Sequence, residues 1–149
     1  MLSESLKVSK VDAFDLDKIK QLLKINELSL EDLKDHLSNF LKIENSDGLI
    51  GVIGLEIYGN YALLRSFAVH PDYQSNGIGK SLMKRLIKKS KILDIKEIYL
   101  FTTTAEKYFV KYGFKKIELT EVNPSVKESS QFRGSCPKSA TIMKKQILM

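Results

Sequence analysis

The residues best suited to chemistry lie where an apolar stretch gives way to an amphipathic one, at Gln74-Ser75-Asn76-Gly77-Ile78-Gly79. Glycines at positions 77 and 79 let another group approach the backbone closely. The first N–H groups of a helix have no internal partner, and the helix dipole adds positive potential, so these groups bind anions. Lys80 places a cation beside them. The segment therefore predicts a phosphate-binding loop at the start of a helix.

Two other phosphate-binding motifs end in a similar way and do not fit. Gly79-Lys80-Ser81 resembles the end of a P-loop, but that motif requires glycine where this chain has Gln74. The GxGxxG dinucleotide pattern fails because position 82 is leucine. Neither a P-loop nor a dinucleotide-binding loop is expected.

Hydrophobic periodicity predicts the elements that must position this loop. The helical patterns cover residues 15–26, a second helix after Ser29 and residues 77–90, with a short helix at 105–111. The β-branched, apolar stretches that predict strands are residues 49–57, 61–69, 97–102, 114–119 and 140–148. Residues 121–138 carry the late Ser, Pro, Gly and Asn signals and are expected to form a long loop. This order predicts one mixed α/β domain over residues 1–149.

Two local signals refine these elements. Ser29 and Asp32 resemble a capping box for the second helix, and Gly59-Asn60 suits a tight hairpin turn between residues 49–57 and 61–69. The apolar stripe expected on the second helix is Leu30, Leu33, Leu37, Phe40 and Leu41.

Length and composition exclude several classes. A chain of 149 residues fits one domain and buries enough surface to fold without disulfides or metals. Its one cysteine, Cys136, excludes an intramolecular disulfide and a cysteine-based zinc cluster, and two histidines make a His-rich metal centre unexpected. No metal is predicted. The polar start, MLSESLKVSK, lacks the apolar core of a signal peptide, and no apolar run is long enough to span a bilayer. We expect a soluble, cytoplasmic protein without membrane partners.

The formal net charge of +6 favours anionic partners. Lysine supplies nearly all of the excess, and arginine, the usual residue for bidentate base readout, occurs three times. The positive charge suggests a nucleic-acid-binding module as one hypothesis, but the small number of arginines argues against it.

The pattern Q/R-x-x-G-x-G/A following V-x-P resembles the acetyl-CoA-binding motif of the GNAT superfamily of N-acetyltransferases. The resemblance extends to the order of elements and to the short helix that ends at Gly113-Phe114. GLEIYGNYALLRSFAVHPDYQSNGIG, LFTTTAEKYFVKYGF and QFRGSCPKSATIMKK are similar to N-acetyltransferases associated with bacterial arsenic-resistance operons. The motif region is also similar to the acetyltransferase domain of N-acetylglutamate synthases. These resemblances imply a small amine or amino acid as acceptor.

The superfamily resemblance implies a mostly antiparallel central sheet flanked by helices, in which the strand before the motif splays from its neighbour. It implies that exposed backbone groups at Phe67-Ala68-Val69 bind pantetheine and that one N–H polarises the thioester carbonyl. The residues implied to hold the pyrophosphate are Gln74, Ser75, Asn76, Gly77, Ile78, Gly79 and Lys80. Superfamily members are often dimers, so the resemblance leaves open whether this chain forms a homodimer.

The reaction implied is direct attack of a neutral amine on the acetyl thioester, which requires a group to remove a proton from the amine. Glu56 is the carboxylate proposed for this, because its apolar neighbours would raise its pKa. The alternatives are that Glu56 faces solvent or pairs with Arg65. Arg65 is expected either to bind a substrate carboxylate or to form an internal salt bridge.

The general acid is where the chain departs from the superfamily. The tyrosine often found four residues before the Gly-Phe pair is Phe109 here, and Tyr108 lies next to it. Three readings stay open: solvent protonates the thiolate, Tyr108 is recruited, or catalysis is lost. The last reading gives the alternative function, a catalytically silent domain that binds or senses acetyl-CoA.

Further substrate contacts are expected from Thr103, which ends a strand, and from Arg133 in the late loop. Threonines at a strand end are also ordinary strand chemistry. Cys136 lacks a paired histidine and is not expected to act as a nucleophile.

Overall fold

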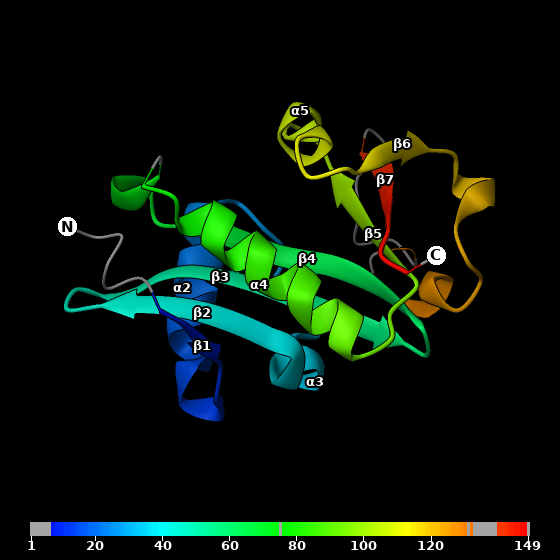
Figure 1. Ribbon diagram of the computed structural model, residues 1–149. Coiled ribbons are helices and arrows are strands. Elements are labelled where there is room, and N and C mark those ends of the chain that lie inside the picture. The colour runs from blue at the N-terminus through cyan, green and yellow to red at the C-terminus, as the bar shows by residue number, and fades with distance from the viewer. Residues whose placement is uncertain (1–6, 75, 131, 133–139, 149) are drawn as a thin grey trace. The chain divides into compact units, whose positions relative to one another are not determined.

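The computed structural model describes residues 7–74, 76–130, 132 and 140–148, and these form one seven-stranded sheet in the order β1-β2-β3-β4-β5-β7-β6 (Figure 1). The strands are β1 (Val8–Lys10), β2 (Phe40–Asn45), β3 (Gly48–Tyr58), β4 (Tyr61–Val69), β5 (Glu97–Thr102), β6 (Lys115–Ile117) and β7 (Thr141–Gln146). The helices are α2 (Leu16–Ile25), α3 (Leu33–His36), α4 (Ile78–Ile92) and α5 (Glu106–Val110). Short 3-10 turns are η1 (Ala13–Asp15), η2 (Leu37–Asn39), η3 (Pro71–Tyr73), η4 (Leu119–Glu121) and η5 (Val126–Glu128). This is the mixed α/β fold that the sequence predicted.

The chain divides into two compact units. The first comprises Met1–Leu55 and Ser66–Lys89, and the second comprises Glu56–Arg65 and Ser90–Met149.

In the first unit, β1, β2 and β3 form antiparallel ladders, with α2 and α4 on opposite sides of these strands (Figure 1). Alternation along β3 separates the two sides. A Cβ added to Gly51 would lie 2.6 Å from Ile78 Cγ2, so glycine here lets α4 approach the strand closely. The next residue, Val52, belongs to the core that packs against α2, whose other buried members are Val11, Ile19, Leu22, Leu23, Leu33, Phe40 and Ala68.

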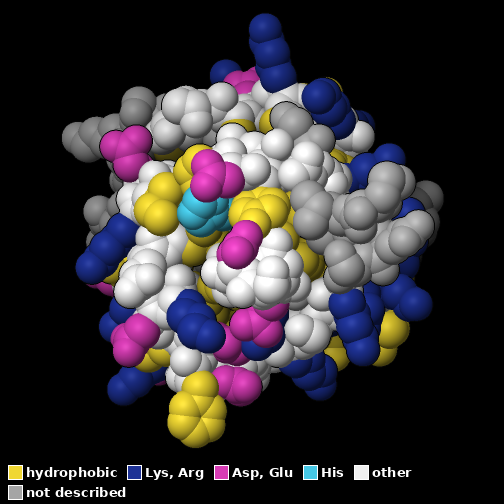
Figure 2. Space-filling view, turned by 90° about the vertical axis from the view of Figure 1, so that its left-hand side faces the viewer, with side chains coloured by type: hydrophobic (Ala, Val, Ile, Leu, Met, Phe, Trp, Pro, Cys, Tyr) yellow, Lys and Arg dark blue, Asp and Glu magenta, His cyan; other side chains and the backbone are white. Residues whose placement is uncertain are grey.

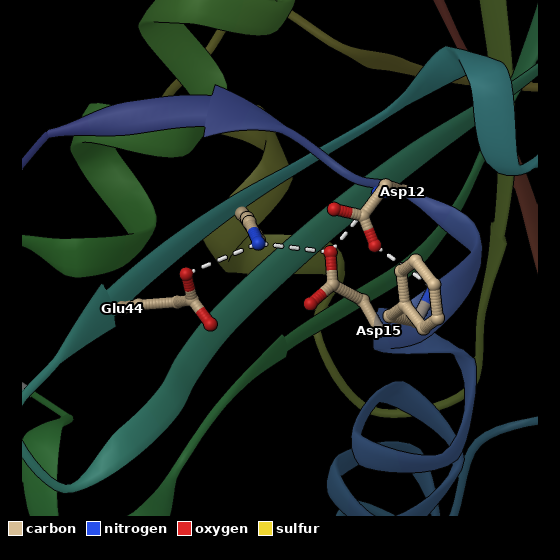
Figure 3. Close-up of polar contacts among 5 residues, drawn as sticks. Asp12, Asp15 and Glu44 are labelled. Atoms are coloured by element: carbon tan, nitrogen blue, oxygen red, sulfur yellow. Dashed lines mark hydrogen bonds and ion pairs between the residues drawn. The ribbon is translucent and has the colours of Figure 1, made fainter.

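A buried ion pair joins the start of α2 to β2 in this unit (Figure 3). Lys42 Nζ lies 2.8 Å from Asp15 Oδ2 and 3.0 Å from Glu44 Oε1. Burial opposes ionisation of Asp15, but hydrogen bonds from the Asp12 N–H and the Lys42 ammonium outweigh it and lower the pKa of Asp15. Burial would likewise lower the pKa of Lys42, and its two carboxylate partners raise it instead.

In the second unit, β4 pairs with β5 in parallel, and β7 lies antiparallel between β5 and β6. Its core combines residues of β4 and β5 with the segment after β6: the buried members are Leu63, Tyr99, Val122 and Val126. The β4–β5 ladder joins residue pairs from Tyr61 with Glu97 to Leu63 with Tyr99, whereas β4 runs on to Val69 and β5 to Thr102.

Most predicted elements are confirmed, and the second helix is wrong. The strands at 49–57, 61–69 and 97–102 and the helices at 15–26 and 77–90 appear with boundaries shifted by at most two residues, and Gly59 takes the positive φ (+66°) expected of the turn. The region after Ser29 forms one helical turn, α3, and then strand β2. Asp32 has φ +55° and no capping contact, so the predicted capping box does not form.

Two absences hold for the residues that the structure describes. Among them, no helix is both long and apolar enough to cross a bilayer. Within the same residues, no three His, Cys, Asp or Glu side chains come together as metal ligands would.

Candidate functional site

The loop that leaves β4 in the first unit is fastened by its own backbone. His70 N–H donates to the Ile50 carbonyl at 2.8 Å, Tyr73 N–H donates to the His70 carbonyl at 2.9 Å, and Asn76 N–H donates to the Tyr73 carbonyl at 3.3 Å. The Tyr73 hydroxyl also hydrogen-bonds to Asp47 in the β2–β3 turn. The segment between the strand and α4 is therefore a defined turn rather than an open connection.

Gly77 sets the direction in which α4 begins. Its φ is +81°, a left-handed conformation that favours glycine, and a Cβ placed there would meet nothing within 4 Å. Ser81 N–H donates to the Gly77 carbonyl at 3.0 Å, so the N–H groups of residues 78–80 precede the first bond of this kind in the helix. Asn76, Gly77 and Lys80 are exposed. Among the described residues, the start of α4 thus has N–H groups without an intrahelical acceptor and the open approach that an anion needs.

The side chains of Ile78 and Gln74, two residues of the predicted loop, have structural contacts instead of facing a ligand. The Ile78 side chain is buried at the β3 contact, so its backbone N–H is the group left for a ligand. The Gln74 side chain donates from Nε2 to the Val69 carbonyl at 3.2 Å, and Asn26 Nδ2 approaches the same carbonyl at 3.4 Å. Gln74 therefore closes the loop onto β4. Ser75 lies outside the described residues.

The predicted pantetheine strand, Phe67-Ala68-Val69, forms the end of β4 in the first unit. It follows Ser66, whose φ of +56° interrupts the extended backbone. Ala68 is buried in the α2 core, and Phe67 and Val69 are half-buried.

Charges are mixed on the face of the first unit that Figure 2 turns toward the viewer. Lys and Arg side chains lie among Asp and Glu side chains there (Figure 2). An anion at the start of α4 would therefore be bound by directed N–H groups, with Lys80 beside them, more than by a broad basic surface.

Glu56 and Arg65 form a buried ion pair in the second unit. Arg65 Nη1 donates to Glu56 Oε2 at 2.7 Å, and each side chain is 1% exposed. The pairing is the alternative that the sequence left open for both residues. It fixes the orientation of the Arg65 guanidinium within this unit.

Two hydroxyl groups complete the surroundings of Glu56. Its Oε1 atom accepts hydrogen bonds from Tyr58 at 2.5 Å and from Ser129 at 2.7 Å. Burial and the hydrogen bond to Glu56 raise the pKa of Tyr58 to about 12, so its phenol keeps its proton at neutral pH. The carboxylate is therefore held by donors from β3, β4 and the segment that follows η5.

Sequence reasoning missed Tyr58 and Ser129. Tyr58 lies two residues from Glu56 on the same strand, so the period of two along a strand places both on one face and was a usable signal. Ser129 is 73 positions from Glu56, and no local pattern connects them.

Tyr108 is paired with another tyrosine on and after α5. Its hydroxyl lies 3.2 Å from the Tyr112 hydroxyl, and burial together with this contact raises the pKa of Tyr108 well above its ordinary value. Phe109 is buried, with its ring 5.7 Å from that of Phe114. Phe109 thus serves the core, and Tyr112 is a neighbour that sequence reasoning did not consider.

The structure shows no substrate-binding arrangement for the remaining predicted substrate residues that it describes. Thr103 is exposed after β5, while the preceding Thr102 uses its Oγ1 to accept the Ala105 N–H at 2.9 Å. Arg133 and Cys136 lie outside the described residues.

Comparisons with known proteins agree with this organisation. The sequence model of a family described as "Acetyltransferase (GNAT) domain" matches residues 36–116. The amino-acid acetyltransferase of Vibrio atlanticus is 31% identical over 96 residues, which cover 63% of this chain and 22% of that protein. The corresponding protein of Buchnera aphidicola is 30% identical over 113 residues, 72% of this chain and 25% of that one. The chain thus spans a quarter or less of these relatives.

Solved structures show the same fold. N-acetylglutamate synthase from Neisseria gonorrhoeae, complexed with coenzyme A and N-acetyl-glutamate, has a TM-score of 0.82 at 20% identity, over 97% of this chain and 35% of that one. Rv2747 from Mycobacterium tuberculosis, in complex with CoA and NLQ, has a TM-score of 0.80 at 22% identity, over 95% of this chain and 99% of that one.

Proposed function

Because the chain belongs to the acetyltransferase (GNAT) domain family, we propose that it transfers the acetyl group of acetyl-CoA to the amine of a small amino-acid-like acceptor by direct attack. The observation that carries the proposal is the start of α4, where Gly77 turns the chain and free N–H groups face an open approach. The names of the relatives, amino-acid acetyltransferases, support the acceptor class. We treat residues 1–149 as one domain, since β3 and β4 each contribute residues to both compact units.

The donor-binding residues we propose are those whose backbone fits a pyrophosphate. N–H groups of Gly77 through Lys80 would bind its oxygens, with the Lys80 ammonium beside them. When bound, acetyl-CoA supplies the activated acetyl thioester. The end of β4, Phe67-Ala68-Val69, would offer a backbone N–H to the carbonyl oxygen as negative charge develops on it.

Glu56 is our proposed proton acceptor for the amine. Its Arg65, Tyr58 and Ser129 contacts all donate to the carboxylate oxygens, which fits a group that accepts a proton. Both oxygens are occupied by these contacts, so proton transfer would require the hydroxyl partners to rearrange. Arg65 is proposed to bind an acceptor carboxylate, a role that requires the guanidinium to become accessible beyond the buried geometry described above.

The proton that the leaving thiolate takes up is proposed to come from solvent. The pairing of Tyr108 with Tyr112 and the raised pKa of Tyr108 make this tyrosine a weak acid for the purpose. A thiolate is a tolerable leaving group, so the step does not require a strong acid. Thr103 and Arg133 stay proposed acceptor contacts.

The experiment that tests the function is release of free CoA from acetyl-CoA in the presence of L-amino acids, beginning with glutamate and related acids. We expect release that depends on the amino acid, together with a product whose mass is raised by one acetyl group. Calorimetric binding of acetyl-CoA without any turnover would instead support the silent binding domain that Phe109 at the usual tyrosine position suggests. A folded protein that neither binds nor turns over acetyl-CoA would contradict both.

A further inference from the structure

The buried carboxylate of Glu56 touches a hydroxyl group whose residue also reaches the surface. Glu56 is 1% exposed, so direct exchange of a proton with bulk water is hindered. Of the two hydroxyls that donate to its Oε1 atom, that of Ser129 belongs to a buried residue, whereas that of Tyr58 belongs to a half-buried one. Of these two donors, Tyr58 is therefore the residue with the greater exposure.

Tyr58 also lines an open hollow of about 420 Å³ in the same unit. The hairpin turn between β3 and β4 forms one side, and the segment around η5 forms the other. Its other lining residues are Gly59, Asn60, Tyr61, Asn123, Ser125 and Glu128. The hollow is open to solvent and roomy enough to hold water.

A base that acts in every turnover must also lose its proton in every turnover. We propose that Tyr58 passes the proton of Glu56 to the water of this hollow, an inference that rests on the proposed role of Glu56 as the base. Of the other two groups described as hydrogen-bonded to Glu56, the Arg65 guanidinium does not give up a proton, and Ser129 is buried.

The step is balanced in atoms and charge. The Glu56 carboxylate takes a proton from the acceptor ammonium, which becomes the attacking amine. The new carboxyl O–H then donates to the Tyr58 oxygen, which accepts this proton as its own O–H proton leaves for water. The carboxylate and the neutral phenol are both restored, and no electrons change hands. The hydroxyl suits this role because it donates and accepts at once.

The variant that tests the relay is Tyr58→Phe, which keeps the ring and removes the hydroxyl. We expect its kcat to fall by about 10-fold or more, a part of what general acid–base groups contribute, with the KM for acetyl-CoA unchanged. A small buffer such as imidazole, which can enter the hollow, should restore kcat as its concentration rises. The matched control is Tyr61→Phe, which changes the same hollow at a tyrosine that, among the described contacts, makes no hydrogen bond to Glu56. It should leave kcat unchanged.

Three outcomes would overturn the relay. They are a Tyr58→Phe enzyme with the kcat of the wild type, one whose lowered kcat no small buffer restores, and equal buffer rescue of Ser129→Ala, whose lost hydroxyl is buried. Tyr58→His keeps a group that exchanges protons near neutral pH, and it should exceed Tyr58→Phe in kcat without added buffer. Failure of the proposed function looks different, since then the wild type shows no acetyl transfer or Glu56→Gln retains its full kcat.

Discussion

Nη1 of Arg65 lies 2.7 Å from Oε2 of Glu56, and both side chains are almost completely withdrawn from water. Such a pair gains from mutual attraction and loses from desolvation, so its presence alone says little about net stability. Loss of one partner is another matter, because the remaining charge is buried without its counterion. Substitution of Glu56 on β3 should therefore be tolerated better when Arg65 on β4 is substituted as well.

The first prediction concerns this constraint. Arg65→Met should lower the free energy of unfolding by about 3–5 kcal/mol, because Glu56 loses its counterion while staying buried. Glu56→Met combined with Arg65→Met should recover more than half of that loss. Urea unfolding at pH 7 measures both. Lys144→Met is the control, since its ion pair with Glu97 is more exposed and should cost no more than about 1 kcal/mol. Equal losses of unfolding free energy in Arg65→Met and Lys144→Met would contradict the prediction.

The second prediction concerns the start of α4. Gly77→Ala should weaken acetyl-CoA binding modestly, because alanine at φ +81° is strained by about 1–2 kcal/mol although its Cβ has room. Gly77→Glu adds a negative charge beside the proposed phosphate site and should abolish binding. Titration calorimetry with acetyl-CoA and with CoA measures both. Gly59→Ala, at the left-handed hairpin turn, controls for the strain alone. Wild-type affinity in Gly77→Glu would contradict the assignment.

The third prediction concerns pH and the ion pair of Figure 3. The pKa of Asp15 is lowered in the folded protein, so its contribution to stability is present above its unfolded value of 3.8 and is lost as the pH falls through the folded pKa. The pKa of Lys42 is raised, so its contribution persists up to pH 10.5 and is lost at higher pH. Asp15→Asn should therefore cost about 1.5–3 kcal/mol at pH 7 and progressively less below pH 4.

Urea unfolding of wild type and variant across pH measures this difference. The control is Asp17→Asn on the exposed face of α2, which should cost at most about 1 kcal/mol from the helix dipole. A cost of Asp15→Asn that stays constant from pH 7 to pH 2 would show that the ion pair is not its source.

The fourth prediction concerns Tyr108. Because its hydroxyl contacts Tyr112 and its pKa is raised, Tyr108→Phe should change kcat by less than about threefold, well below the effect of losing a general acid. Tyr112→Phe serves as the matched variant, and steady-state rates from pH 6 to pH 9 supply the measurement. A hundredfold loss confined to Tyr108→Phe would identify it as the acid after all.

The sequence was informative where local rules decide the structure. The strand ending at Val69, the turn at Gly59 and the helix after Gly77 follow from β-branched composition, left-handed glycines and apolar spacing, and all three are present. The second helix, whose expected apolar stripe ran from Leu30 to Leu41, stops early for a tertiary reason. Phe40 and Leu41 pair with Gly54 and Ile53 of β3, and this pairing prevails over the helical spacing of their side chains.

The candidate site divides in the same way. The residues of the proposed anion-binding loop are contiguous in the sequence, so their types and spacing were sufficient to predict it. The surroundings of Glu56 are not contiguous, because Ser129 comes from a segment with no periodic pattern. The sequence named Glu56 and Arg65 and posed their pairing as an alternative, but the choice required three-dimensional packing.

The hydrogen bond between Tyr73 and Asp47 has a consequence for protein engineering. Turns between adjacent strands are customary places to insert a tag, a reporter or a second domain, because insertions there are usually tolerated. The β2–β3 turn of this chain is fastened to the segment that precedes α4. A fluorophore attached at Asp47 should therefore report the arrival of acetyl-CoA, whereas a bulky insertion there should impair its capture.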